Sequence, residues 1–517
     1  MWRSPAPNQT GLFERSWLRV GTAAISFMIY ASAVVALHQH YDNSFCCERI
    51  GLAAALSHVV YRGPLGDVYP EIQAQLNDAQ APLESLLDRA AHLDPPPDKP
   101  TTATNDGNGL GFIVVASWAV SLFGPHLSAF PFFMLVLMAI SAATFLWRFV
   151  DDRSAVVTTT FFSLTLMLCT PLVWNPVIAS QIPIGGIRYY SLLAVVPAFH
   201  LVLELADADW EADAARRQRA VLLTVQVIIL VLAVLVRGSA AYVVGPILLI
   251  GLATAWKNRA DHHMLHRLRR NAVIIALVGI VFIGSLLLAL PKDYVREGRL
   301  ATTTEFWHRA VVSLGINPAW PFGNLREVYD CKSGGIPEGL VAAPVDRNGH
   351  CIWWSYVTTH NIPTGRALVE MYGSRYEAAQ RAAFFDIARL YPDEVLVTFL
   401  YYKPAWLLQA MEYLVLNPAV PSPILMTLVI ASFANFLLFL VIIAGSSAGS
   451  LILLRLTGLG TLFGVSSIPP YFTAWATPHT TADLLFYCLF CIGLGIGSAM
   501  QPIGAAVRRR SAMLARA

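Results

Sequence analysis

The sequence predicts an all-α transmembrane protein with about ten membrane-spanning helices. Of its 517 residues, 56% are hydrophobic and only 13% are charged, whereas soluble chains carry about 25% charged residues. Long apolar segments recur along the chain, each near the ~20 residues that cross a bilayer core. Short arginine-rich connections separate several of them, as is typical of cytoplasmic loops. The net charge of +3 is too small to indicate a nucleic-acid partner.

The first apolar segment, about residues 17–37, is expected to be an uncleaved signal anchor whose N-terminus is cytoplasmic. It follows Arg3 and Arg15, exceeds the length of a signal-peptide core and lacks a clear small-residue cleavage site. Further spans are expected at residues 127–150, 155–175, 186–206, 220–236, 240–256, 271–291, 422–445, 451–469 and 482–500.

Charge distribution excludes two shorter segments, Leu110–Phe123 and Val395–Leu416, from the spans. If Leu110–Phe123 crossed the membrane, the basic connection Lys257–Arg270 would lie on the external side. If Val395–Leu416 crossed, the arginine-rich C-terminal tail would lie on the external side. If neither crosses, every basic connection, including the one that begins at Arg148, lies in the cytoplasm with both termini. We therefore expect Leu110–Phe123 to be interfacial or re-entrant, and Val395–Leu416 to form a helix on the outer surface.

Two large external regions follow from this topology. In the first, Tyr69–Leu93 has apolar residues at helical spacing and is expected to form an interfacial amphipathic helix interrupted at Pro82. In the second, Thr364–Leu390 has helix-forming composition, with Glu377 and Arg381 spaced as an i,i+4 pair. The expected divisions are a transmembrane module at 1–291 that includes the first external loop at 38–126, an external region at 292–421 with mixed polar and aromatic composition, and C-terminal transmembrane helices with a basic tail at 422–517.

Two cysteines in the second external region are candidates for a structural disulfide. Cys331 and Cys351 are 20 residues apart, and an oxidising compartment would allow them to pair. The sequence favours a disulfide and two free thiols equally.

Carboxylates just beyond the first span are candidate general bases. Asp42 lies five residues past the end of the span at residue 37, and Glu48 and Asp67 come later in the same loop. Such an acid could take the proton from an attacking hydroxyl, or be a solvated loop residue. His38, His40 and Asp42 alternate along the chain and would share a face of an extended segment, so a metal site is a further alternative. No metal ligand is assigned, and a divalent metal is left open as a cofactor.

Two arginines are candidate phosphate contacts. Arg237 interrupts an apolar run, and Arg188 lies at the external start of another span. A guanidinium at that depth is costly unless paired, and its fork matches a phosphate; each could instead reach out to lipid phosphates. Tyr189, His308 and His479 lie among external aromatic segments and are assigned to a substrate cleft, although such residues also form interface belts.

The layout resembles the GT-C membrane glycosyltransferases, a family that includes protein mannosyltransferases and aminoarabinose transferases. A signal-anchor span leads into an acidic external loop, and the segment Gly109-Leu110-Gly111…Leu122-Phe123-Gly124 resembles the short helix that follows in that family. The resemblance covers about the first 290 residues. The usual prolines before the short helix and the adjacent acidic pair after the first span are absent.

The resemblance implies an inverting transfer of a sugar from a polyprenyl-phosphate donor to an extracytoplasmic acceptor. It implies that Asp42 is the catalytic acid of the first loop, with Glu48 as its rival, and that Arg237 contacts the donor phosphate. The enzyme would lie in the inner (cytoplasmic) membrane with its site facing the periplasm or exterior. A transporter or lipid flippase is the alternative, and a non-catalytic membrane assembly factor is a third. No P-loop, dinucleotide or hydrolase motif supports another chemistry.

Overall fold

The computed structural model describes residues 49–62, 64–65, 67–76, 83–92, 101–102, 110–126, 129–148, 193–206, 213–236, 241, 243–257, 259–289, 306–317, 347–364, 367, 374–405 and 472. Within these residues the chain is helical apart from one pair of two-residue strands, which confirms the all-α class. The predicted spans outside the described residues are 17–37, 155–175, 422–445, 451–469 and 482–500.

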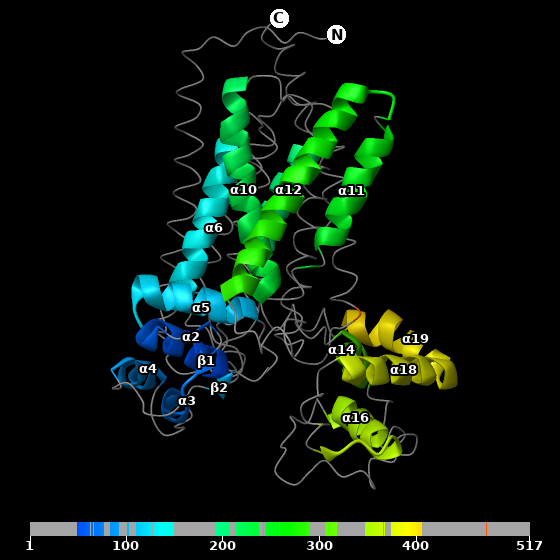
Figure 1. The fold of residues 1–517 in the computed structure, drawn as a ribbon. Coiled ribbons are helices and arrows are strands. Elements are labelled where there is room, and N and C mark those ends of the chain that lie inside the picture. The colour runs from blue at the N-terminus through cyan, green and yellow to red at the C-terminus, as the bar shows by residue number, and fades with distance from the viewer. Residues whose placement is uncertain are drawn as a thin grey trace, which may run out of the picture.

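A helical bundle forms the centre of the described structure (Figure 1). Its helices are α6 (Ala129–Arg148), α9 (Val195–Ala206), α10 (Asp213–Val236), α11 (Val244–Lys257) and α12 (His262–Ala289). Helix α10 packs against α6, α9 and α12. Leu223, Val227 and Leu230 of α10 are buried, and their spacing of four and three residues places them on one face.

Two described helices are long and apolar enough to cross a membrane: Arg219–Val236 within α10 and Leu265–Leu288 within α12. The apolar window is 44% buried in α10 but only 11% buried in α12. A core helix of a soluble protein would be mostly buried, whereas α12 presents its apolar side chains outward along most of its length.

The predicted boundaries of two basic segments are wrong. The connection expected at Lys257–Arg270 is mostly helical, because α12 begins at His262 and the N–H of Leu265 donates to the carbonyl of Asp261 at 3.0 Å. Helix α10 begins at Asp213, so Arg216, Arg217 and Arg219, which precede the span expected at 220–236, also lie on a helix rather than in a cytoplasmic loop. Histidine, arginine and leucine are compatible with a helix, so the charges extend these helices instead of ending them.

Helix α5 (Leu110–Phe123) has the bounds of the segment excluded from the spans. Its 14 residues are about 21 Å long at 1.5 Å per residue, short of a bilayer core. Figure 1 shows α5 lying across the end of the bundle, where it packs against α6 and α10. Gly124 has a φ of +86° and its N–H donates to the carbonyl of Val120 at 2.9 Å, which ends α5 and turns the chain toward α6.

The elements of the segment expected to be the first external loop lie beyond α5, on the side away from the bundle, and α2 packs against α5 (Figure 1). They are α2 (Arg49–Tyr61), β1 (Asp67–Val68), α3 (Pro70–Leu76), α4 (Leu83–Ala91) and β2 (Thr101–Thr102). The strands pair antiparallel, with Asp67 opposite Thr102. The region expected to be one interrupted amphipathic helix forms α3 and α4. Leu87 and Ala90 on the apolar face of α4 are fully buried, so protein rather than an interface covers this face.

The described part of the region expected to be external, residues 292–421, is a separate helical module. It consists of α14 (Phe306–Ser313), the 3-10 turn η3 (Leu314–Ile316), α16 (Arg347–Thr359), α18 (Ser374–Leu390), α19 (Pro392–Val397) and the π-helix η4 (Thr398–Tyr402). Helix α18 packs against α14, α16 and α19. In Figure 1 this module lies toward the same end of the bundle as α5.

Candidate functional site

Most of the residues that the sequence assigned to the site lie outside the described residues. These are Asp42, Glu48, Arg188, Tyr189, Arg237 and His479. Two of them have a described chain neighbour: α2 begins at the residue after Glu48, and α10 ends at the residue before Arg237. Both helices pack against α5. Helix α5 therefore contacts both of the helices that these two residues flank in sequence.

Asp67 is the first-loop acid that the structure describes. It begins β1, and its N–H donates to the carbonyl of Pro64 at 3.2 Å. The adjacent Tyr69 is held by its own N–H, which donates to the Ser57 hydroxyl of α2 at 3.1 Å, and by edge contact with the ring of Tyr61. Partial burial raises the pKa of the Asp67 carboxyl above its ordinary value of 3.8. Such a shift favours a carboxyl group that can exchange a proton.

His308 lies in the core of the second module. Its side chain is 3% exposed, and its Nδ1 is 2.8 Å from the hydroxyl of Tyr376, which is itself fully buried. Gly349 of α16 lies against the imidazole, where an added Cβ would be 2.3 Å from Nδ1. The described surroundings of His308 are therefore packed protein, and the imidazole joins α14 to α16 and α18.

Glu377 of α18 caps the start of α14. Its carboxylate accepts hydrogen bonds from the N–H groups of Trp307 at 2.8 Å and His308 at 3.3 Å. These N–H groups lie in the first turn of a helix and have no partner within it, and a negative charge there also interacts favourably with the helix dipole. The acid that the sequence paired with Arg381 thus joins two helices 70 residues apart.

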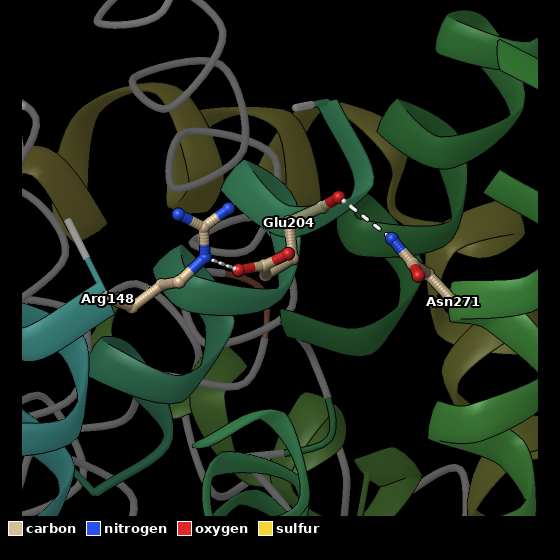
Figure 2. Close-up of polar contacts among 3 residues, drawn as sticks. All are labelled: Arg148, Glu204 and Asn271. Carbon is tan, nitrogen blue, oxygen red and sulfur yellow. Dashed lines mark hydrogen bonds and ion pairs between the residues drawn. The ribbon is translucent and has the colours of Figure 1, made fainter. Parts of the chain in front are cut away.

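A buried ion pair joins α6 to α9 in the bundle (Figure 2). Arg148, the last residue of α6, donates through Nε to the Glu204 carboxylate, and their side chains are 10% and 0% exposed. Asn271 of α12 donates through Nδ2 to the backbone carbonyl of Glu204 at 3.2 Å. Glu204 therefore contacts two neighbouring helices, one through its side chain and one through its backbone.

Hydrogen bonds between neutral side chains also join α6 to α10. The Ser141 hydroxyl donates to Gln226 Oε1 at 2.7 Å. The Gln226 amide nitrogen donates in turn to the Ser141 carbonyl at 2.7 Å and to the Thr144 hydroxyl at 2.8 Å. One turn before Glu204, the fully buried His200 contacts the ring of Phe145. Polar groups buried in this way fix which helix faces meet, because each needs its particular partner.

Lys403, which follows η4, is a buried cation in the second module. Its side chain is 1% exposed, and Nζ donates to the Ser313 hydroxyl at 2.9 Å and to the Phe472 carbonyl at 2.5 Å. Nζ also lies 4.1 Å from the centroid of the Phe399 ring. Burial lowers the pKa of this amine well below its ordinary value of 10.5.

The described residues contain no group of three or more histidine, cysteine, aspartate or glutamate side chains arranged to hold a metal ion. His38 and His40, the other members of the metal alternative, lie outside them. Cys351 on α16 is disulfide-bonded, as the paired-cysteine alternative expected; Cys331, its predicted partner, is outside the described residues.

Sequence reasoning missed the Glu204 ion pair, although a signal for it is present. Glu204 lies in the apolar run Leu201-Val202-Leu203-Glu204-Leu205, and an acid in such a run is a candidate for a paired or functional role. Arg148 had been assigned to a cytoplasmic loop by its charge alone. No protein-family model, curated protein or solved structure matches the chain.

Proposed function

We propose that the chain is an integral membrane glycosyltransferase that moves a sugar from a polyprenyl-phosphate donor to an extracytoplasmic acceptor, either a lipid, a glycan or a protein. The reaction of a lipid-linked sugar takes place at the membrane interface, because its prenyl chain stays in the bilayer and its phosphate in the headgroup layer. An enzyme for such a donor needs spanning helices and a helical layer across their end.

The packing of α5 against both α2 and α10 carries this proposal. Helix α5 lies across the bundle end, with the first-loop elements beyond it (Figure 1). The chain enters this layer just after Glu48 and leaves α10 just before Arg237. A carboxylate and a guanidinium brought to α5 from these two sides would serve the acceptor hydroxyl and the donor phosphate.

The proposed orientation follows from the charges of the bundle. Arg148 ends α6, Arg219 lies in the first two turns of α10 and Arg267 near the start of α12, and these helix ends lie away from α5 in Figure 1. Basic residues concentrate on the cytoplasmic side of membrane proteins. We place this end in the cytoplasm, with ten spans in the inner membrane and α5 on the periplasmic or external side.

In the proposed mechanism, Asp42 or Glu48 removes the proton of the acceptor hydroxyl. The acceptor oxygen attacks the anomeric carbon from the face opposite the phosphate, the bond from carbon to phosphate oxygen breaks, and polyprenyl phosphate leaves with the electron pair. Arg237 and Arg188 stabilise the charge of the leaving phosphate, since the guanidinium fork matches phosphate oxygens. The configuration at the anomeric carbon is inverted.

The test replaces each acid by its amide, Asp42→Asn and Glu48→Gln, in the full-length protein. Transfer is measured with a radiolabelled polyprenyl-phosphate sugar and membrane acceptors. We expect loss of transfer in one of the two variants, by about 10²–10⁴-fold for a general base, with unchanged expression. Asp88→Asn is the matched control, because Asp88 is an exposed acid of α4 in the same layer. Full activity in both test variants would refute the assignment.

A transporter or lipid flippase is the second candidate, and the Arg148–Glu204 pair favours it. Charged side chains within spanning helices often mark a substrate or proton path, and this pair lies at the junction of α6, α9 and α12 (Figure 2). Purified protein in sealed vesicles distinguishes the two functions. Movement of a lipid-linked sugar across the bilayer without covalent change would favour the transporter, and formation of a glycosylated product would favour the transferase.

A further inference from the structure

We propose that the basic end of the α11–α12 hairpin binds the headgroup of an anionic phospholipid on its outward surface. The proposal rests on the membrane placement of the bundle and not on sugar transfer. From Lys257 to Arg270 the chain carries five lysine or arginine residues and three histidines, with Asp261 as the acid among them. Figure 1 shows α11 and α12 joined at the bundle end away from α5.

Helix α11 carries an outward apolar stripe that ends in a tryptophan. Leu248, Leu249, Leu252 and Trp256 are 62%, 59%, 67% and 73% exposed. Their spacing places them on one face of the helix. Exposure of so many large apolar side chains in a row is typical of contact with acyl chains. Tryptophan at the end of such a stripe is typical of the headgroup level.

Helix α12 carries a matching stripe that ends in basic side chains. Val273, Leu277 and Ile280 are 48%, 55% and 67% exposed. Arg269 lies four residues before Val273 and His266 three residues before Arg269, so both continue this stripe, and both are exposed. The same face of α12 thus changes from apolar to cationic within one turn.

Each change from apolar to polar side chains takes about one turn of its helix. Trp256 lies four residues beyond Leu252 on α11, and Arg269 lies four residues before Val273 on α12, which is about 6 Å along each axis. The guanidinium of Arg259 lies 4.8 Å from the centre of the Trp256 ring, which holds a third group at this level. A phospholipid whose phosphate lies among these groups would place its acyl chains beside the exposed leucines.

Charge selects an anionic lipid as the occupant. Guanidinium groups bind phosphate oxygens in a bidentate geometry, and juxtamembrane basic clusters attract anionic headgroups. A zwitterionic headgroup adds an ammonium group that the cluster would repel. A second copy of the chain docked through this surface would bring two basic clusters together and is disfavoured for the same reason.

The test titrates short-chain phosphatidylglycerol into detergent-solubilised full-length protein and follows the unfolding temperature. We expect Arg259→Gln/Arg269→Gln to weaken the apparent affinity about twenty-fivefold, which is about fivefold for each arginine. The control, Arg381→Gln/Arg389→Gln, removes two exposed arginines from α18 in the other module and should leave the affinity unchanged. Equal affinity in the two double variants would overturn the proposal.

Three further arms use the unmodified protein, so they decide the question even where a variant is unstable. Phosphatidylcholine of the same chain length should bind more weakly than phosphatidylglycerol, and inorganic phosphate should give no shift. Raising the salt concentration from about 0.1 M to about 1 M should weaken phosphatidylglycerol binding, because the screening length falls from about 10 Å to about 3 Å. Equal binding of both lipids, a full shift with phosphate alone or salt-independent binding would each overturn it.

Discussion

Removing one partner of the Arg148–Glu204 pair should destabilise the bundle by an amount that depends on which charge remains. Arg148→Gln leaves the Glu204 carboxylate, which is 0% exposed, without its guanidinium. Removing one partner of a buried ion pair costs about 3–5 kcal/mol. Glu204→Gln leaves Arg148, which is 10% exposed at the last residue of α6. This side chain can turn outward, and a glutamine oxygen can still accept from Nε, so we expect a cost of about 1–2 kcal/mol.

The double variant separates this explanation from a general loss of packing. With both side chains changed to glutamine neither member of this pair is charged, so Arg148→Gln/Glu204→Gln should be more stable than Arg148→Gln alone. The coupling energy should be about 1–3 kcal/mol. The Asn271 hydrogen bond goes to the Glu204 backbone carbonyl and is retained in every variant.

The assay is equilibrium unfolding of the full-length protein in mixed micelles, followed by tryptophan fluorescence. Arg389→Gln on α18 serves as the control for loss of an exposed arginine, and it should change the free energy of unfolding by less than about 0.5 kcal/mol. The buried-charge explanation is refuted if the losses in free energy of unfolding from the two single changes add without coupling. It is also refuted if Glu204→Gln destabilises the protein more than Arg148→Gln does.

Two further predictions concern the second module. Gly349→Ala should destabilise the module by about 1–3 kcal/mol, because the added Cβ would be 2.3 Å from His308 Nδ1. The control Gly315→Ala should not destabilise it, because nothing lies within 4 Å of its Cβ. Thermal unfolding compares the two variants, and equal midpoints would contradict the close packing around His308. The second concerns Lys403, whose pKa is lowered by burial. The unfolded chain holds the Lys403 proton up to pH 10.5 and the folded chain loses it earlier, so stability should rise with pH between the lowered pKa and 10.5. In Lys403→Met this rise should be absent, which unfolding midpoints measured across alkaline pH check; parallel profiles in the two proteins would contradict the lowered pKa of Lys403.

The parts of the fold that the sequence could predict depend on local pattern. Continuous hydropathy located α6, α10 and α12 because a spanning helix needs only its own apolar length. Counting charges excluded Leu110–Phe123 from the spans, and α5 occupies those residues. The two errors in helix start, at Asp213 and His262, share a cause. Arginine and histidine mark the membrane boundary, but they do not end a helix.

The pairings could not be predicted, because they depend on which helices become neighbours. Arg148 and Glu204 are 56 residues apart, and neither residue identifies its partner. Glu377 had a plausible partner on its own helix, yet it caps α14. His308 was assigned to a cleft because it lies among aromatic residues, and the same neighbours bury it under Tyr376. Residue type predicts that a polar group needs a partner, whereas tertiary packing decides which one.

The distribution of polar contacts indicates where a lipid-linked donor would enter the bundle. Arg148, Glu204 and Asn271 join α6, α9 and α12 toward the basic end, and each contact is directional, so separating these helices there would expose unpaired groups. At the other end α5 presents apolar residues to its neighbours, including the buried Phe112 and Val115. Apolar packing is non-directional, and an acyl chain can replace it at little cost. We therefore expect a prenyl chain to enter between helices at the α5 end, which is also where the proposed reaction requires its phosphate.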